Sequence, residues 1–442
     1  MRMKLMAGAA LALVMASPSI ANESTVIQNN LNNTATVDQA SGAKGKSAIT
    51  QNGQDNLAKV DQSDLSSAGT SGTRNDSTIV QSGAANLADV KQTNTGAGAS
   101  PANVSSITQT GSNAAALLDQ TGSGNNSAIN QAATGPVTAD VTQNGTGNQS
   151  TVGQSGNNTT VYVDQGITNG TSTDSIATID QGSSDSVINV KQGGTAQSVI
   201  ASQLGTQNAM SVDQSGAENF ANVLQTGNFG SIFVQQIGTS SGSSAFLEQT
   251  GNGSVLTVNQ DGAANLVGSG MNAFVQSADN STAYMEQVGL LHFVGGTQAG
   301  TANSLDIRQG GSAQTAQVSQ SGSGNTMAVR QQLNGNFALL NQSGTGNAMD
   351  LFQNGSFNTA SVNQSGTGNN LLISQAGGMN SVNVLQNGIN GLIDIDQSTS
   401  GAHAQVTQGG GTGNRAFVTQ ASLDAIAIIT QAGTNNYAFV NQ

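Results

Sequence analysis

Glutamine recurs along almost the whole chain at a spacing of 11 residues, and this spacing limits what the chain can fold into more than any other feature. The series runs from Gln28 to Gln442, and 27 of its 35 intervals are 11 residues long. The residue two before each Gln is large and apolar in 34 of the 36 units, with Ala201 and Gly296 as exceptions, and the residue six before is Asn in 19. Positions two apart share one face of an extended chain. The pattern therefore predicts β-strands, not helices.

A short segment that often contains glycine separates one unit from the next. The pattern Q-x-G-x-x-N occurs 14 times, and glycine supplies the positive φ of a tight reversal without steric cost. Each unit is predicted to be a strand of about seven residues followed by a corner of about four. The corner glycines singled out are Gly53, Gly83, Gly216, Gly344, Gly355 and Gly366.

Two features of the sequence indicate two strands per turn of a solenoid. When the units are numbered from Gln28, the five longest insertions all precede odd-numbered units, namely those that end at Gln81, Gln109, Gln181, Gln249 and Gln276. Insertions in solenoids tend to emerge from one side. The residue before Gln is charged in 11 even units and in only two odd units. We therefore expect an all-β fold, a β-solenoid (β-helix) of about 18 turns with two strands in each 22-residue repeat, one sheet being more charged than the other.

Stacking of identical side chains is the predicted source of order inside this solenoid. Val, Ile and Ala would form a dry core, while Asn and Gln amides would stack on copies of themselves in neighbouring turns and so satisfy one another. The predicted ladder residues are Asn56, Val60, Gln62, Asn86, Val90, Gln92, Asn219, Val223, Gln225, Asn347, Leu351, Gln353, Asn358, Val362, Gln364, Asn436, Val440 and Gln442. Because the pattern starts at Asn22 and runs to Gln442, we expect uncapped ends that receive further strands.

The repeat resembles that of the curlin family, the subunits of curli fibres. A clear copy is Gln81-x-Gly83-x2-Asn86-x-Ala88-x3-Gln92, with Ser77 four residues before the first Gln. The resemblance covers nearly all of residues 22–442, with many more repeats than usual and no leader before the first one. It implies a functional amyloid of the cell surface, a pilus-like or fimbrial fibre for cell adhesion and biofilm matrix. It also implies a nucleator subunit and an outer-membrane export channel as partners.

The N-terminal segment, residues 1–21, reads as a secretory signal peptide, so residues 22–442 would form the mature, secreted solenoid. Basic Arg2 and Lys4 precede an apolar run that is too short to span a membrane, and small residues precede a cut after Ala21. The chain carries a net charge of −13 and no cysteine, which argues against nucleic acid as a partner and excludes thiol chemistry.

No group of residues suggests catalysis, a metal site or a cofactor site, so we expect a protein that is not an enzyme. The two histidines fall at repeat positions, His292 six before a Gln and His403 five before one, and are interpreted as structural. The alternative function is a monomeric secreted β-solenoid that acts as an adhesin or an ice-binding protein. Regular outward threonine rows would favour ice binding, but the outward positions vary.

Overall fold

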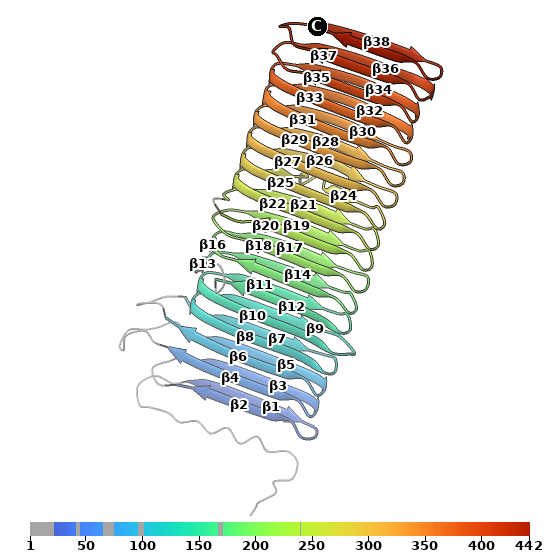
Figure 1. Ribbon diagram of the computed structural model, residues 1–442. Coiled ribbons are helices and arrows are strands. Elements are labelled where there is room, and N and C mark those ends of the chain that lie inside the picture. The colour runs from blue at the N-terminus through green and yellow to red at the C-terminus, as the bar shows by residue number, and fades with distance from the viewer. Residues whose placement is uncertain (1–21, 41–44, 65–74, 96–100, 167–170, 239) are drawn as a thin grey trace, which may run out of the picture. The chain divides into compact units, whose positions relative to one another are not determined.

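The computed structural model describes residues 22–40, 45–64, 75–95, 101–166, 171–238 and 240–442. The predicted signal peptide, residues 1–21, lies outside the described residues. The chain divides into two units, residues 1–218 and 219–442, which are taken separately below. Within the described ranges every regular element is a β-strand, and Figure 1 shows the strands of each unit stacked one above another.

Unit 1 contains two parallel sheets. Its sheet A consists of β1 (Glu23–Asn29), β3 (Lys46–Gln54), β5 (Asp76–Ala84), β7 (Val104–Gln109), β9 (Asn126–Gln131), β11 (Gln149–Gln154), β14 (Ile176–Gln181) and β17 (Ser198–Gln203). Its sheet B consists of β2 (Thr34–Gln39), β4 (Leu57–Asp64), β6 (Leu87–Asn94), β8 (Ala114–Ser123), β10 (Val137–Thr146), β12 (Thr159–Gln165), β13 (Ser172–Thr173), β15 (Val187–Gln192), β16 (Gly194–Thr195) and β18 (Ala209–Gln214).

Unit 2 repeats the same arrangement. Its sheet A consists of β19 (Phe220–Gln225), β21 (Ser244–Gln249), β23 (Leu266–Val267), β24 (Phe274–Gln276), β26 (Phe293–Gln298), β28 (Thr315–Gln320), β30 (Phe337–Gln342), β32 (Thr359–Thr367), β34 (Ser381–Ile389), β36 (His403–Thr412) and β38 (Ile426–Ala432). Its sheet B consists of β20 (Ser231–Gln236), β22 (Val255–Ala263), β25 (Thr282–Leu290), β27 (Ser304–Ser312), β29 (Thr326–Asn334), β31 (Ala348–Ser356), β33 (Asn370–Gly378), β35 (Leu392–Gln397), β37 (Arg415–Gln420) and β39 (Tyr437–Asn441).

Each strand pairs in parallel with the strand one turn away, so that equivalent residues lie side by side. In unit 1, Val60 and Gln62 of β4 are in register with Val90 and Gln92 of β6. In unit 2 the same register joins β30 to β32, where Gln342 lies beside Gln364. Successive repeat units of the chain place their strands alternately in sheets A and B, and this alternation confirms the prediction of a β-solenoid with two strands in each repeat of about 22 residues and about 18 turns in all.

The core lies between the two sheets of each unit. The alternating burial along β6 and β28 matches the period of two in the sequence, with inward residues buried and outward residues at least partly exposed. Gly296 is an exception to the large apolar residue two before each Gln, and its neighbour in the adjacent turn accounts for it. The fully buried Phe274 lies beside Gly296 in that turn. A large ring next to a missing side chain keeps the core filled.

The insertion before Gln276 lies within a strand. The extra residues 268–273 interrupt a sheet A strand, between β23 and β24, and an antiparallel bridge joins Ser269 to Asn272. The spacing of glutamines reveals the length of an insertion but not where within the unit it leaves the strand.

Candidate functional site

The glutamines form continuous ladders along the axis of each unit. In unit 1, the side-chain amide of Gln62 donates to Oε1 of Gln92 at 2.8 Å, and Gln92 donates to Gln120 at 2.8 Å. In unit 2, Gln342 donates to Gln364 at 2.8 Å, and Gln225 donates to Gln249 at 2.7 Å. Because every amide donates in the same direction, each ladder has a donor end and an acceptor end.

Most of the ladder glutamines also join the two sheets, which the sequence did not suggest. Nε2 of Gln62, on sheet B, donates to the backbone carbonyl of Lys46 on sheet A at 3.0 Å. Nε2 of Gln342, on sheet A, likewise donates to the carbonyl of Thr326 on sheet B at 2.9 Å. The strict use of Gln at this position is the sequence signal that could have indicated this link, because the Gln side chain is longer than that of Asn and reaches the facing sheet.

The asparagine column works differently from the predicted amide-to-amide stack. Asn347 in unit 2 is typical: its Oδ1 accepts from the backbone N–H of Asn369, and its Nδ2 donates to the carbonyls of Ser343 and Gly366, at 2.7 to 3.0 Å. In unit 1, Asn86 similarly donates to the carbonyl of Gly111. Asparagine therefore ties down the backbone of the corners, since its short side chain ends beside their carbonyl groups.

The remaining predicted ladder residues lie where these columns require, except in the last turn. All but three are buried, with at most 2% of their surface exposed: Asn56, Val60, Gln62, Asn86, Val90, Gln92, Asn219, Val223, Gln225, Asn347, Leu351, Gln353, Asn358, Val362 and Gln364. Asn436 and Val440 are only half-buried, and Gln442 is exposed. These three residues belong to the last described turn, where no further strand among the described residues covers them.

Positive φ explains five of the six predicted corner glycines. Gly53, Gly83, Gly216, Gly344 and Gly366 have φ between 98° and 127°.

The sixth corner glycine, Gly355, does not have a positive φ. An added Cβ there would lie 1.6 Å from the carbonyl oxygen of Gly377, so close approach of the next turn is what requires glycine. A second left-handed position, four residues after Gln, escaped the sequence analysis. It is occupied by Gly346 but also by Ala85 and Phe357.

His292 replaces asparagine in the column and copies its hydrogen bonds. The backbone N–H of Gln314 donates to Nδ1 at 3.3 Å, and Nε2 lies 3.1 Å from the carbonyl oxygen of Val288. The side chain is buried, and this burial lowers the pKa of His292 despite the backbone hydrogen bonds. A neutral ring serves this role because Nδ1 must accept a hydrogen bond.

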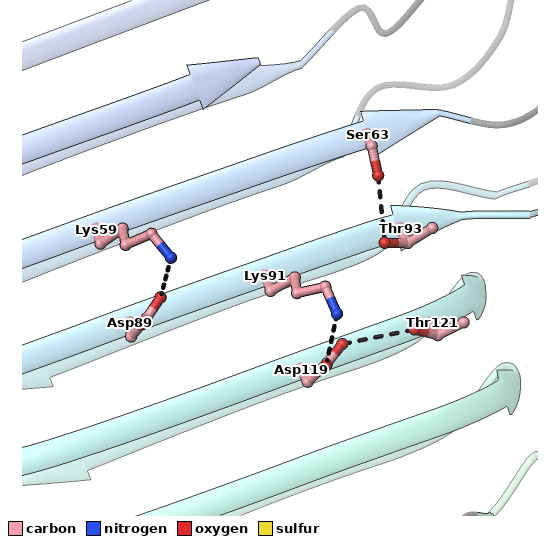
Figure 2. Close-up of polar contacts among 7 residues, drawn as sticks. All are labelled: Lys59, Ser63, Asp89, Lys91, Thr93, Asp119 and Thr121. Carbon is pink, nitrogen blue, oxygen red and sulfur yellow. Dashed lines mark hydrogen bonds and ion pairs between the residues drawn. The ribbon is translucent and has the colours of Figure 1, made fainter. Parts of the chain in front are cut away.

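Charged side chains collect on the outer face of sheet B. In unit 1, Lys59 of β4 pairs with Asp89 of β6 at 3.7 Å, and Lys91 of β6 pairs with Asp119 of β8 at 3.1 Å (Figure 2). Exposed pairs of this kind stabilise by less than about 1 kcal/mol, but they favour one stacking register over others.

Acidic side chains also crowd one another on sheet B. In unit 1, burial raises the pKa of Asp140, and the charges of Asp119 and Asp164 raise it further. In unit 2, burial and the nearby Asp396 raise the pKa of Asp394. Both pKa values are thus raised mainly by burial, and further by neighbouring carboxylates on the same face.

Together these features define a class of protein: a parallel, in-register β-solenoid built from glutamine and asparagine columns. The Curlin associated repeat family model matches the chain at residues 138–166, 300–332 and 344–377. These three segments are thus curlin-type repeats, in agreement with the resemblance read from the repeats of the sequence. The family is structural and its members are extracellular curli components. Comparison with curated proteins found no match.

The described part of the chain contains no helix that is long and apolar enough to cross a membrane.

Proposed function

We propose that this protein is the structural subunit of an extracellular, curli-type amyloid fibre that serves cell adhesion and biofilm matrix. In this proposal residues 1–21 direct secretion, and the subunits join end to end by strand addition. A nucleator subunit and an outer-membrane export channel are the expected partners, by analogy with the family. The expected location is the cell surface.

The observation that carries the proposal is the direction of the glutamine ladders. In unit 2, Nε2 of Gln431 and Gln442 continue the donor direction, and both donate to backbone carbonyls, those of Arg415 and Ile426. In unit 1, Gln28 donates onward to Gln51, and among the described residues no side-chain amide donates to Gln28. A donor end and an acceptor end are complementary, so copies can join head to tail in an open, non-closing assembly.

The terminal strands support the same mode of growth. The inward residues Ala438 and Val440 of β39 are half-buried, whereas Ala416 and Val418 one turn inward are at most 1% exposed. Backbone groups on the outer edge of β39 would pair with the next copy, and the apolar column would then be covered.

Fibre growth by the purified protein without residues 1–21 tests this function. We expect thioflavin-positive fibres with a cross-β reflection near roughly 4.7–4.8 Å. Val440→Lys should slow elongation strongly, because it places a charge in the inward column of the terminal strand. Thr419→Lys, an outward site on the neighbouring strand β37, is the matched control. Equal elongation rates for the two variants would exclude β39 as the growing edge, and a wild-type chain that remains monomeric would contradict the fibre function and favour the monomeric adhesin or ice-binding alternative.

A further inference from the structure

The two outer faces of unit 2 differ sharply in charge. On sheet A, the outward side chains of β26, β28, β30, β32, β34, β36 and β38, within residues 293–430, include no Asp, Glu, Lys or Arg. On sheet B, the strands of the same turns carry eight outward charged residues: Glu286, Asp306, Arg308, Arg330, Asp350, Asp394, Asp396 and Arg415. We call the sheet A surface formed by these seven strands the neutral face.

The neutral face also exposes large apolar side chains. Phe337 and Leu339 of β30 are each 37% exposed, and Leu385 of β34 is 42% exposed. The remaining outward positions are mostly Thr, Ser, Asn and Gln, which can hydrogen-bond without carrying charge. Short uncharged polar and apolar side chains on a regular sheet are the composition from which dry sheet-to-sheet interfaces are built.

The clefts on the two faces differ in charge in the same way as the faces themselves. A cleft of about 380 Å³ on the neutral face is bordered by the loop residues Ser269 and Asn272 and reaches Leu339 and Asn341, and its lining includes no charged side chain. On sheet B of unit 2, a cleft of about 350 Å³ is lined by Glu286, Arg308 and Arg330 among others. Covering the second cleft would require burying charges, at a cost that pairing rarely recovers.

We propose that the neutral face binds the neutral face of a second copy of this chain, so that solenoids pair side by side in addition to growing at their ends. The face is large enough for this. Seven strands about 4.8 Å apart, each presenting six residues of about 3.3 Å, cover roughly 700 Å². Two such faces bury about 1,400 Å², which lies within the range of stable, specific interfaces. The acidic sheet B faces then lie outermost, where water screens their repulsion.

Charge placed on one face or the other tests the pairing. The test variant is Ser319→Lys with Asn363→Lys, two residues that directly precede Gln on the neutral face. The matched control is Ser374→Lys with Thr419→Lys, which occupy the same repeat position on sheet B, also two turns apart. Both variants change the net charge equally, so only the face differs.

Mass per length of the fibres, measured by scanning transmission electron microscopy, is the readout. A single solenoid has about 4.6 kDa per nm, because a 22-residue turn of this 442-residue, 44.1 kDa chain rises roughly 4.8 Å. We expect twice that value for the wild-type chain and for the control, and a twofold drop to the single value for the test variant. Single-width wild-type fibres, or a drop in the control but not in the test variant, would overturn the proposal.

The pairing can be separated from the proposed fibre function. If the test variant still elongates at the wild-type rate, end-to-end growth stands and only pairing is lost. If no variant forms fibres, the fibre function fails, and sedimentation velocity of the soluble chain then decides the pairing. Dimers of wild type and control with a monomeric test variant would support pairing, and a monomeric wild type would refute it.

Discussion

Gln331 offers the sharpest test of the ladders, because its neighbour Gln332 allows the same substitution on the opposite side of the strand. Gln331 is fully buried. Its Oε1 accepts from Gln309 at 2.9 Å, and its Nε2 donates to Gln353 at 2.9 Å and to the carbonyl of Thr315 at 3.0 Å. Gln332 is exposed. Gln331→Leu should therefore destabilise the chain while Gln332→Leu should not.

The size of the effect follows from the groups left without partners. Gln331→Leu leaves one amide hydrogen of Gln309 and Oε1 of Gln353 unsatisfied in the core, at about 1–3 kcal/mol each. Burying the leucine returns about 1 kcal/mol. We expect the free energy of unfolding to fall by about 1–5 kcal/mol, and by less than about 0.5 kcal/mol for Gln332→Leu.

Urea unfolding of the dilute, unassembled chain, followed by circular dichroism, measures this difference. Hydrogen exchange of residues 309–353 checks that the loss is local, as expected for a stack in which each turn contacts only its neighbours. Replacing Gln309, Gln331 and Gln353 together by Leu again leaves one donor and one acceptor at the ends of the gap, in Gln287 and Gln375. The triple variant should cost far less than three times the single one. Equal losses for Gln331→Leu and Gln332→Leu, or strict additivity, would refute the ladder argument.

Three further tests, with four substitutions in all, address the corners, the asparagine column and the core. Gly344→Ala should lower the free energy of unfolding in urea by at least about 2 kcal/mol, because its Cβ would lie 2.0 Å from the carbonyl oxygen of Gly366. The control, Gly346→Asn, should lower it by under about 1 kcal/mol, because no atom would lie within 4 Å of the added Cβ and the φ of 63° suits Asn. Similar losses for the two variants would refute the steric explanation. Since the pKa of His292 is lowered on folding, the unfolded chain binds the proton first, and the free energy of unfolding should fall as pH drops through about 6.5. His292→Asn should remove this part of the pH dependence. An unchanged dependence of the free energy of unfolding on pH would contradict this role of His292. Ser105→Ala should raise the free energy of unfolding by about 1 kcal/mol, because its buried hydroxyl has no hydrogen-bond partner among the residues that the structure describes; a loss instead would reveal a bound water.

The strands and their pairing could be predicted because the constraint on them is periodic. A one-residue slip would turn every Val and Ile outward, so the period of two determines which side chains face the core. The concentration of charged residues in the even-numbered units determines which strands belong to the same sheet. The roles of individual amide atoms could not be predicted in the same way. Gln and Asn carry the same donor and acceptor groups, and only the distance to a backbone carbonyl decides that Gln342 bridges the sheets while Asn347 holds a corner.

The corners were harder to predict for a related reason. Sequence spacing predicts Gly355 as a corner glycine but cannot distinguish a glycine required by its own φ from one required by the carbonyl of the next turn, which is a contact between residues far apart in the chain. The left-handed position after it is occupied by Phe357, whose φ is 60°. The regular stack above and below holds that residue in a conformation which its own sequence disfavours.

In unit 2, the surfaces proposed for growth and for pairing lie at right angles to each other. The ladder direction is a property of the axis, so a substitution in the inward column of β39, such as Val440→Lys, acts on the rate of elongation. The neutral face lies along the side, so Ser319→Lys with Asn363→Lys acts on the number of solenoids in a fibre. If both surfaces work as proposed, elongation rate and mass per length should vary independently across these variants. If elongation rate and mass per length always changed together, lateral contact would itself be the step that adds the next chain. The directional ladder would then contribute only to stability.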